Sequence, residues 1–282
     1  MTGRRVAVTG AGGQLGGELV RAFGGAGDEV LALGRGDLDI TRPSDLDRLV
    51  GWHPEVVVNS AAWTDVDGCA RDPERAALTN GVAAGEVARA AAAVGALIVQ
   101  ISSNEVFDGT SQRPYHEDDE PSPINPYGAS KLAGEVAVAR ANDRHLIVRT
   151  AWLYGAGDRN FPGKIRHAAA RALEERKPLL VVFDEWGNPT DVRWLAPAIR
   201  RLSELALAGT ATLAVYHLAG EPPASRLDWA RAILRESPVR IEPVPLAEFR
   251  RASEVPKRAV LDTTRARDLG IAAHRWRTGL PL

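Results

Sequence analysis

Short apolar runs alternate with helix-like segments through the first 150 residues of this 282-residue chain, and this alternation restricts the possible folds more than any other feature. Five runs rich in Val, Ile and Leu predict strands at residues 4–9, 29–33, 55–59, 97–102 and 145–150. They hardly alternate between apolar and polar residues, which is typical of strands buried on both faces. Helical patterns cover residues 14–24, 43–50, 73–94 and 126–141. Repeated strand and helix units of this length predict an α/β fold with a doubly wound parallel sheet.

A glycine-rich loop, residues 10–16, lies between the first predicted strand and the first predicted helix. Its glycines allow a tight turn and let backbone N–H groups approach a pyrophosphate at the helix N-terminus. In this context the loop predicts a Rossmann-type dinucleotide site formed by Gly10, Gly13, Gln14, Leu15 and Gly16. Its spacing has one residue more than the dehydrogenase pattern G-x-G-x-x-G.

The end of the second predicted strand bears on the choice of cofactor. An NAD enzyme usually places an acidic residue there, on the adenosine ribose, whereas this chain has Arg35. An arginine can meet a 2′-phosphate, which favours NADPH and leaves NADH as the alternative. We expect Asp39 and Ile40 to contact the adenine. Small residues after the third predicted strand, Ala61 and Ala62, would leave room for the cofactor.

The regular alternation weakens after about residue 150, where prolines become frequent. Helical patterns remain at residues 162–176, 192–208 and 225–236, and residues 214–218 predict one more strand. We therefore expect residues 1–150 to form the dinucleotide-binding domain. Residues 151–282 would form mainly a smaller, irregular α+β lobe for the substrate, with segments at about 190–220 returning to the first domain.

Composition excludes several classes of protein. The 35 basic and 36 acidic residues leave a formal charge of −1, which gives no reason to expect nucleic acid or an anionic membrane as partner. The apolar start is too short for a signal peptide, and Glu86 and Arg89 interrupt the most apolar long segment, residues 82–101. The single cysteine, Cys69, fits a reducing compartment, and no Cys/His spacing suggests a metal site. We expect a soluble cytoplasmic protein, with a homodimer left open.

Tyr127 and Lys131 stand four residues apart in a predicted helix, within Tyr-Gly-Ala-Ser-Lys. Residues at this spacing share one face of a helix, so the ammonium can lie beside the phenol and lower its pKa toward neutral pH. Ser103 follows the fourth predicted strand, and the carboxyl ends of parallel strands open into one crevice. Its hydroxyl could there hydrogen-bond a substrate carbonyl oxygen beside the tyrosine. This arrangement is suited to proton transfer at a carbonyl.

Taken together, these residues resemble the extended short-chain dehydrogenase/reductases, and more narrowly their dTDP-4-dehydrorhamnose reductase branch. The narrower resemblance extends over nearly the whole chain. It rests on the motifs at residues 13–16, 38–40, 61–64, 106–109, 127–135 and 149–155. Residues 184–190, Asp-Glu-Trp-Gly-Asn-Pro-Thr, also resemble the branch's substrate-side Asp-Gln-x-Gly-x-Pro-Thr, with glutamate for glutamine.

The resemblance implies hydride transfer from NADPH to the C4 ketone of a nucleotide-linked 4-keto-6-deoxysugar, with dTDP as the expected nucleotide. Tyr127 would protonate the developing alkoxide. Lys131 would lower the pKa of the tyrosine and hold the nicotinamide ribose, and Ser103 would steady the carbonyl oxygen. Trp152, by its family position, would face the sugar. A magnesium site at a dimer interface, known in some relatives, is not carried over because no glutamate cluster supports it.

The chain departs from the branch next to Ser103. Where the rhamnose-forming reductases usually have Thr-Asp-Tyr, this chain has Ser103-Asn104-Glu105, so Asn104 and Glu105 change the expected sugar site. The change leaves the particular 4-ketosugar open. It also leaves two alternatives. The sister 4,6-dehydratases have Thr-Asp-Glu here, although Asn104 cannot supply their proton. Other relatives are non-catalytic NADP-binding regulatory subunits, which would not need the Tyr127 and Lys131 pair.

Overall fold

The structure, a computed structural model, describes residues 3–278. Its centre is a six-stranded sheet in the order β10-β5-β4-β3-β1-β2, and all neighbouring strands run parallel. The strands are β1 (Arg5–Thr9), β2 (Glu29–Leu33), β3 (Val56–Asn59), β4 (Leu97–Ser103), β5 (His145–Thr150) and β10 (Val215–His217). The predicted doubly wound parallel sheet is confirmed. The strand order reverses between β1 and β3, where ligands of such sheets bind.

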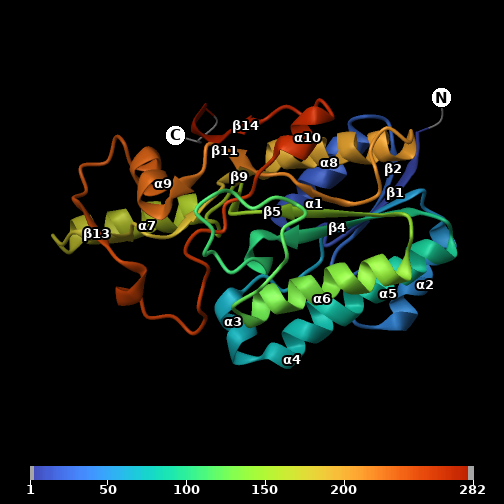
Figure 1. The fold of residues 1–282 in the computed structure, drawn as a ribbon, viewed down its shortest axis with the longest axis horizontal. Helices are drawn as coiled ribbons and strands as arrows, with labels where there is room; N and C mark the ends of the chain where they lie inside the picture. Colours follow the sequence, from blue (N-terminus) through green and yellow to red (C-terminus); the bar gives the residue numbers. More distant parts are fainter. Residues whose placement is uncertain (1–2, 279–282) are drawn as a thin grey trace.

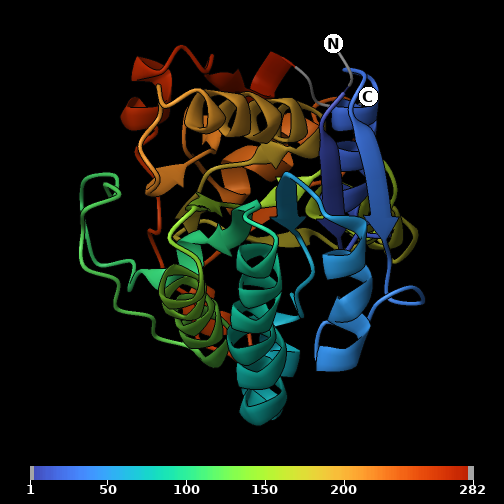
Figure 2. The same cartoon turned by 90° about the vertical axis from the view of Figure 1, so that its right-hand side faces the viewer.

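Helices cover both faces of this sheet (Figures 1 and 2). Alternate strand residues point to opposite faces, so each face has its own apolar cluster. Val6, Val8 and Val58 pack with α1 (Gln14–Gly24) and α8 (Val192–Leu207). Ala7 and Val57 pack on the other face with α2 (Asp47–Trp52), α5 (Ala83–Ala93) and α6 (Pro126–Ala141). The two helical layers hold the carboxyl ends of the strands in fixed positions.

The second half of the chain adds a smaller layer beside the sheet, seen at the left of Figure 1. Here α7 (Phe161–Glu174) and α9 (Arg226–Ile233) pack with the parallel pair β7 (Leu179–Val182) and β13 (Ile241–Val244). Three further two-stranded pairs connect this layer to its surroundings. They are β6 (Leu153–Tyr154) with β9 (Thr190–Asp191), β8 (Trp186–Gly187) with β12 (Ala224–Ser225), and β11 (Gly220–Glu221) with β14 (His274–Arg275).

The predicted helix at 73–94 differs most from the structure. It is divided into α4 (Pro73–Ala76), π-helical turns (Ala77–Val82) and α5, and it follows the unpredicted α3 (Val66–Arg71). The wide turns carry Asn80, whose amide bonds Trp63 O and Ser130 Oγ, both at 3.0 Å. The predicted helix at 43–50 is likewise a 3₁₀ turn (Pro43–Leu46) followed by α2. Short 3₁₀ turns also occur at Asn104–Val106, Leu246–Glu248 and Trp276–Thr278, and α10 spans Thr264–Asp268.

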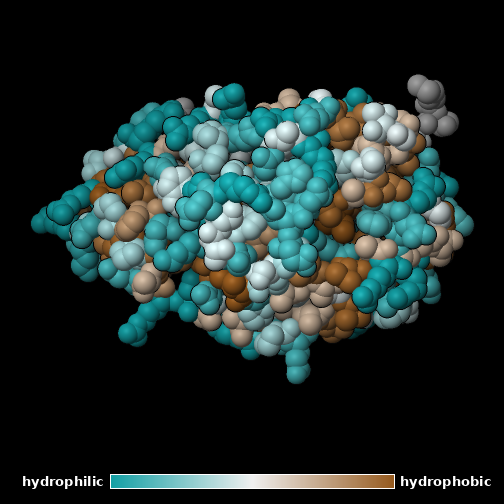
Figure 3. Space-filling model, in the orientation of Figure 1, coloured by the Kyte–Doolittle hydropathy of each residue, from teal (hydrophilic) through white to brown (hydrophobic). Residues whose placement is uncertain are grey.

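Several predicted ends shift by a few residues. The strands predicted from 4 and 55 begin at Arg5 and Val56, and β10 is shorter than the predicted 214–218. The helix predicted at 225–236 begins at Arg226, because Ser225 caps it rather than joining it, and it ends at Ile233. Hydrophilic residues predominate on the face in Figure 3, with apolar groups mainly over its right half. Within residues 3–278, no helix has both the length and the apolar character needed to cross a membrane.

Candidate active site

The glycine loop turns sharply between β1 and α1. Gly10 has φ +70°, and a Cβ on it would lie 2.7 Å from the backbone N of Ala61. A Cβ on Gly16 would lie 2.1 Å from the carbonyl oxygen of Gly10. Gly13 precedes α1 and supplies no capping side chain, so the helix N-terminus is left to a ligand. The loop therefore has the shape of a pyrophosphate cradle, which any side chain at Gly10 or Gly16 would distort.

A cleft of about 700 Å³ opens beside this loop, at the carboxyl ends of β1, β2 and β3. Its volume is in the range typical of ligand sites. Seven of the predicted cofactor residues line it: Gly10, Gly13, Arg35, Asp39, Ile40, Ala61 and Ala62. Hydrogen bonds from Thr41, followed by the nearby arginines 42 and 35, lower the pKa of Asp39, so Asp39 stays ionised beside Arg35. The cleft thus gathers the predicted phosphate, ribose and adenine contacts in one place.

Three other predicted cofactor residues have structural contacts of their own. Leu15 is buried in the apolar cluster under α1, and Gly16 packs on Gly10. Gln14 donates a hydrogen bond from Nε2 to the carbonyl oxygen of Ala156 at 3.0 Å. This bond joins the glycine loop to the loop after β6, which belongs to the second half of the chain.

The cleft also has residues that the sequence did not single out. Arg75, Arg159, Gly12, Leu38, Thr41, Ser60, Leu78 and Thr79 complete its lining. Arg75 lies over the ring of Trp63 at 4.4 Å, and Arg159 comes from the loop that Gln14 contacts. Gly12 lies in the predicted glycine loop and Leu38 in the motif at residues 38–40, whereas Arg75 had no local signal of a cofactor contact. Arg159 had none, because only the fold brings its loop to the glycines.

Tyr127 and Ser103 meet at the carboxyl end of β4. Asn125 caps α6 by accepting the N–H of Gly128 at 2.7 Å, so Tyr127 lies in the first turn. A Cβ on Gly128 would lie 2.0 Å from the carbonyl oxygen of Glu105, which shows how closely α6 approaches the end of β4. The Ser103 hydroxyl lies close enough to Tyr127 to lower the pKa of the phenol, and Tyr127 is only 9% exposed.

The electrostatics of this pair differ from the sequence-based expectation. Burial raises the pKa of Tyr127, the Glu105 carboxylate raises it further, and the neighbouring Ser103 hydroxyl lowers it. Lys131 is buried, and its Nζ donates to the carbonyl oxygen of Ile101 at 2.6 Å. Burial lowers the pKa of Lys131 to about 8, against the attraction of Glu135. The expected acidification of the phenol is therefore absent here, because desolvation dominates its pKa.

Asn104 and Glu105 point to different neighbours. The Nδ2 of Asn104 donates to the carbonyl oxygen of Ala259 at 3.0 Å, so its amide ties β4 to a later segment. Glu105 is half-buried and accepts a hydrogen bond from Nδ2 of Asn125 at 2.7 Å. Burial raises the pKa of Glu105 to about 7, and Glu185 raises it as well. The two unusual residues thus have separate roles in the packing.

Trp152 lies in an aromatic and charged group near Glu105. Its ring stacks on Trp229 with centroids 5.6 Å apart, and the guanidinium of Arg226 lies 3.5 Å from its ring centroid. Trp152 has φ +45°, and a Cβ on Gly187 would lie 2.5 Å from its ring. The Arg226 Nη2 also donates to Oε1 of Glu185 at 2.7 Å. The motif at residues 184–190 is therefore next to Trp152, although spacing alone could not show its partner Arg226.

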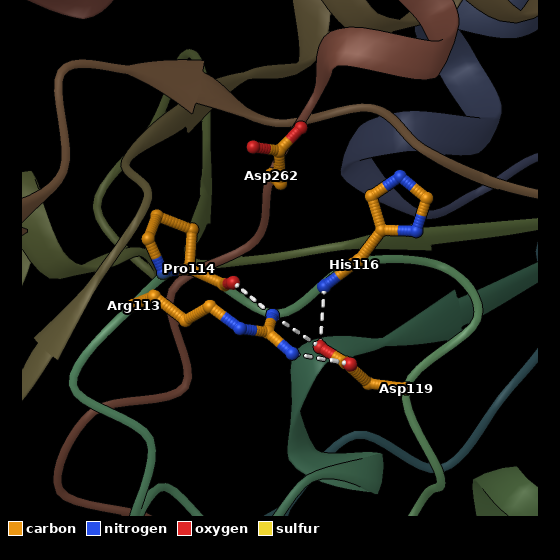
Figure 4. A pocket seen from close by; sticks show the side chains of 5 residues that line it. All are labelled: Arg113, Pro114, His116, Asp119 and Asp262. Carbon is orange, nitrogen blue, oxygen red and sulfur yellow. Dashed lines mark hydrogen bonds and ion pairs between the residues drawn. The ribbon is translucent and has the colours of Figure 1, made fainter.

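A second depression, of about 510 Å³, lies outside the cleft (Figure 4). Arg113, Pro114, His116, Asp119 and Asp262 line it, and it shares no lining residue with the cleft. Arg113 forms two hydrogen bonds with Asp119, both at 2.7 Å, so their charges compensate each other. Among residues 3–278 there is also no group of three or more His, Cys, Asp or Glu side chains arranged for a metal ion.

Comparison with known proteins identifies the family of this chain. The profile of the family described as "RmlD substrate binding domain" matches residues 4–282. A dTDP-4-dehydrorhamnose reductase of Streptomyces griseus is 40% identical over 279 residues, covering 97% of this chain and 90% of that protein. A dTDP-4-keto-6-deoxy-D-glucose reductase of Streptomyces niveus is 37% identical over 279 residues, covering 97% and 94%.

A solved structure agrees as well. The crystal structure of dTDP-4-dehydrorhamnose reductase from Bacillus anthracis str. Ames in complex with NADP has a TM-score of 0.89 and 33% identity to this chain. The match covers 99% of this chain and 97% of that one. The resemblance found in the sequence is thereby confirmed. Since the profile and these relatives extend along nearly its whole length, the chain belongs to the RmlD substrate-binding domain family.

Proposed function

We propose that this protein reduces the C4 ketone of a dTDP-linked 4-keto-6-deoxysugar with NADPH. The observation that carries the proposal is the pairing of Ser103 with Tyr127 at the carboxyl end of β4, in the sheet that carries the glycine cleft. Relatives named as dTDP-4-dehydrorhamnose and dTDP-4-keto-6-deoxy-D-glucose reductases support the substrate class. The NADP in the structure from B. anthracis supports the cofactor.

The side chains of the pair have distinct tasks in this proposal. NADPH, when bound, supplies the hydride for the carbonyl carbon. Ser103 donates a hydrogen bond to the ketone oxygen, and Tyr127 Oη gives its proton to that oxygen as the C=O π bond breaks. The phenolate left behind takes a proton from solvent. Lys131 would hold the nicotinamide ribose with the ammonium that donates to the carbonyl oxygen of Ile101.

The choice between NADPH and NADH would depend on the part of the cleft that Arg35 lines. Arg35 carries a permanent charge in the cleft beside Asp39 and Ile40, which we expect at the adenine, and a 2′-phosphate would meet Arg35 there. A glycine cradle that a Cβ would fill supports pyrophosphate binding at Gly10 and Gly16. Trp152, close to Glu105 and Arg226, is our candidate for the face that meets the sugar.

The proposal also assigns a separate binding role to each half of the chain. Residues 1–150 would bind the dinucleotide and residues 151–282 mainly the sugar. The segment around 190–220 serves the first part, because α8 packs on α1 and β10 pairs with β5. We place the reaction in the cytoplasm, where a single thiol such as Cys69 stays reduced. Burial raises the pKa of this thiol to about 11, which makes it unreactive there.

The test is NADPH oxidation with a panel of dTDP-4-keto sugars. Tyr127→Phe should lower kcat by about 10²–10⁴-fold while NADPH still binds. Tyr216→Phe is the matched control, because its hydroxyl bonds Thr212 at the edge of the sheet, and it should keep the wild-type rate. Equal rates for Tyr127→Phe and wild type would contradict the mechanism.

Two other results would assign a different function. Release of water from a dTDP-hexose without net NADPH consumption would identify a dehydratase. Tight NADPH binding without oxidation by any ketosugar would identify a non-catalytic binding subunit.

A further inference from the structure

A chain of hydrogen bonds connects Ser103 to the helix that carries Tyr127, and it passes through Glu105. The N–H of Glu105 donates to Ser103 Oγ at 3.2 Å, and the Glu105 carboxylate accepts from Asn125 Nδ2 at 2.7 Å. Asn125 in turn accepts the N–H of Gly128 with its Oδ1 at 2.7 Å. The bond between Asn125 and Glu105 joins segments twenty residues apart, and the other two bonds are local. Ser103 and Tyr127 therefore keep their separation through Glu105 and Asn125.

Backbone packing makes this connection rigid. Gly128 faces the carbonyl oxygen of Glu105, with space for no side chain between them. Asn125 Nδ2 also donates to the carbonyl oxygen of Glu254 at 2.9 Å, so both amide donors and the acceptor of Asn125 face named groups. The first turn of α6 is thus fixed against the end of β4 by side chain and backbone together.

The carboxylate of Glu105 also interacts electrostatically with the phenol of Tyr127. Its carboxylate favours the protonated phenol, and Cys69 in α3 acts in the same direction. The charged groups that face Glu105 come from three further segments: Glu185 before β8, Arg226 at the start of α9, and Arg251 in the segment before Ser253. Glu185 opposes the ionised form of Glu105, and the two arginines favour it.

We propose that Glu105 is a positioning residue for the reduction: through Asn125 it ties the first turn of α6 to Ser103, and its charge state sets how readily Tyr127 donates its proton. This inference rests on the proposed function. A neutral Glu105 leaves the phenol a stronger acid, and an ionised Glu105 makes it a weaker one. Because burial places the pKa of Glu105 at about 7, the change falls within the pH range of ordinary assays.

The first experiment compares the pH dependence of kcat/KM for wild type and Glu105→Gln, with NADPH and the best ketosugar of the panel. Wild-type kcat/KM should fall by about three- to tenfold as the pH rises through 7, since a weaker acid transfers its proton more slowly. Glu105→Gln keeps an acceptor for Asn125 but cannot ionise, so it should lack this step and stay near the low-pH level of wild type. Glu236→Gln, an exposed residue outside the site, should keep the wild-type profile.

The second experiment tests positioning. Glu105→Ala removes the acceptor as well as the charge and should lower kcat by about 10- to 100-fold relative to Glu105→Gln. Asn125→Ser keeps an N-cap for α6 but removes the amide that reaches Glu105, and it should show a comparable loss. Thermal unfolding and the NADPH Kd of each variant show that the protein is folded and binds cofactor.

The outcomes separate the two proposals. An inactive wild type on every ketosugar refutes the proposed function. An active wild type whose step near pH 7 persists in Glu105→Gln refutes the coupling of Glu105 to Tyr127. Equal kcat for Glu105→Ala and Glu105→Gln refutes the positioning role, whatever the pH profile.

Discussion

Lys131 is buried at a cost in stability, and removing its charge should make the protein more stable. Lys131 is 3% exposed, and burial lowers its pKa from 10.5 to about 8. At about 1.4 kcal/mol for each pH unit, the folded state at pH 7 is less stable by about 3 kcal/mol than it would be without this charge. Lys131→Met also leaves the carbonyl oxygen of Ile101 without its donor, which costs about 1–2 kcal/mol. The expected net gain is about 1–2 kcal/mol.

The sign of the pH dependence identifies the cause of this gain. Between pH 8 and 10.5 the unfolded chain holds the Lys131 proton more tightly than the folded protein does, so wild-type stability from this group rises with pH. The advantage of Lys131→Met should therefore shrink by about 2 kcal/mol between pH 7 and pH 10. Urea unfolding of both proteins at several pH values measures it.

A matched control comes from Lys177, which is exposed and paired with Glu175. Lys177→Met should differ from wild type by a constant, small amount at every pH. An advantage of Lys131→Met that stays constant or grows toward pH 10 would refute the argument from desolvation. The same Lys131→Met variant should lose NADPH oxidation by orders of magnitude, so that stability and activity change in opposite directions.

Further predictions concern the cofactor cleft. Arg35→Ser should raise the NADPH Kd by about 10- to 100-fold and leave NADH binding nearly unchanged, measured by fluorescence titration; equal losses for both cofactors would contradict a 2′-phosphate contact. Gly16→Ala should destabilise the protein by about 1–3 kcal/mol in thermal unfolding, because its Cβ would meet the carbonyl of Gly10. Arg159→Ala should weaken both cofactors alike by about tenfold, and unaltered titrations would remove it from the site.

Local patterns were enough to predict the centre of the fold. Strands β2 and β5 and helices α1 and α6 have the predicted bounds, because their apolar runs and their flanking glycine or proline residues are local signals. Ser103 was predicted near Tyr127 because it follows the fourth strand. This prediction needed only the rule that the carboxyl ends of parallel strands meet at one edge of the sheet.

Features that depend on distant contacts could not be predicted in this way. The π-helical turns allow Asn80 to hydrogen-bond Trp63 and Ser130, and no local sequence pattern predicts these partners. The pKa of Tyr127 was misjudged for a similar reason. The i, i+4 spacing shows Lys131 but not the desolvation that dominates, nor the carbonyl of Ile101 that takes the ammonium.

Strand β10 and helix α8 come late in the chain, yet they finish the sheet that the first 150 residues begin. During synthesis on a ribosome, the edge of β5 stays unpaired until more than sixty further residues have been made, and one face of the sheet stays uncovered until more than forty have been made and α8 begins. Contacts that close such long intervals slow folding. A stalled or prematurely terminated chain would therefore present an unpaired parallel strand, the kind of surface that chaperones bind and aggregates grow from.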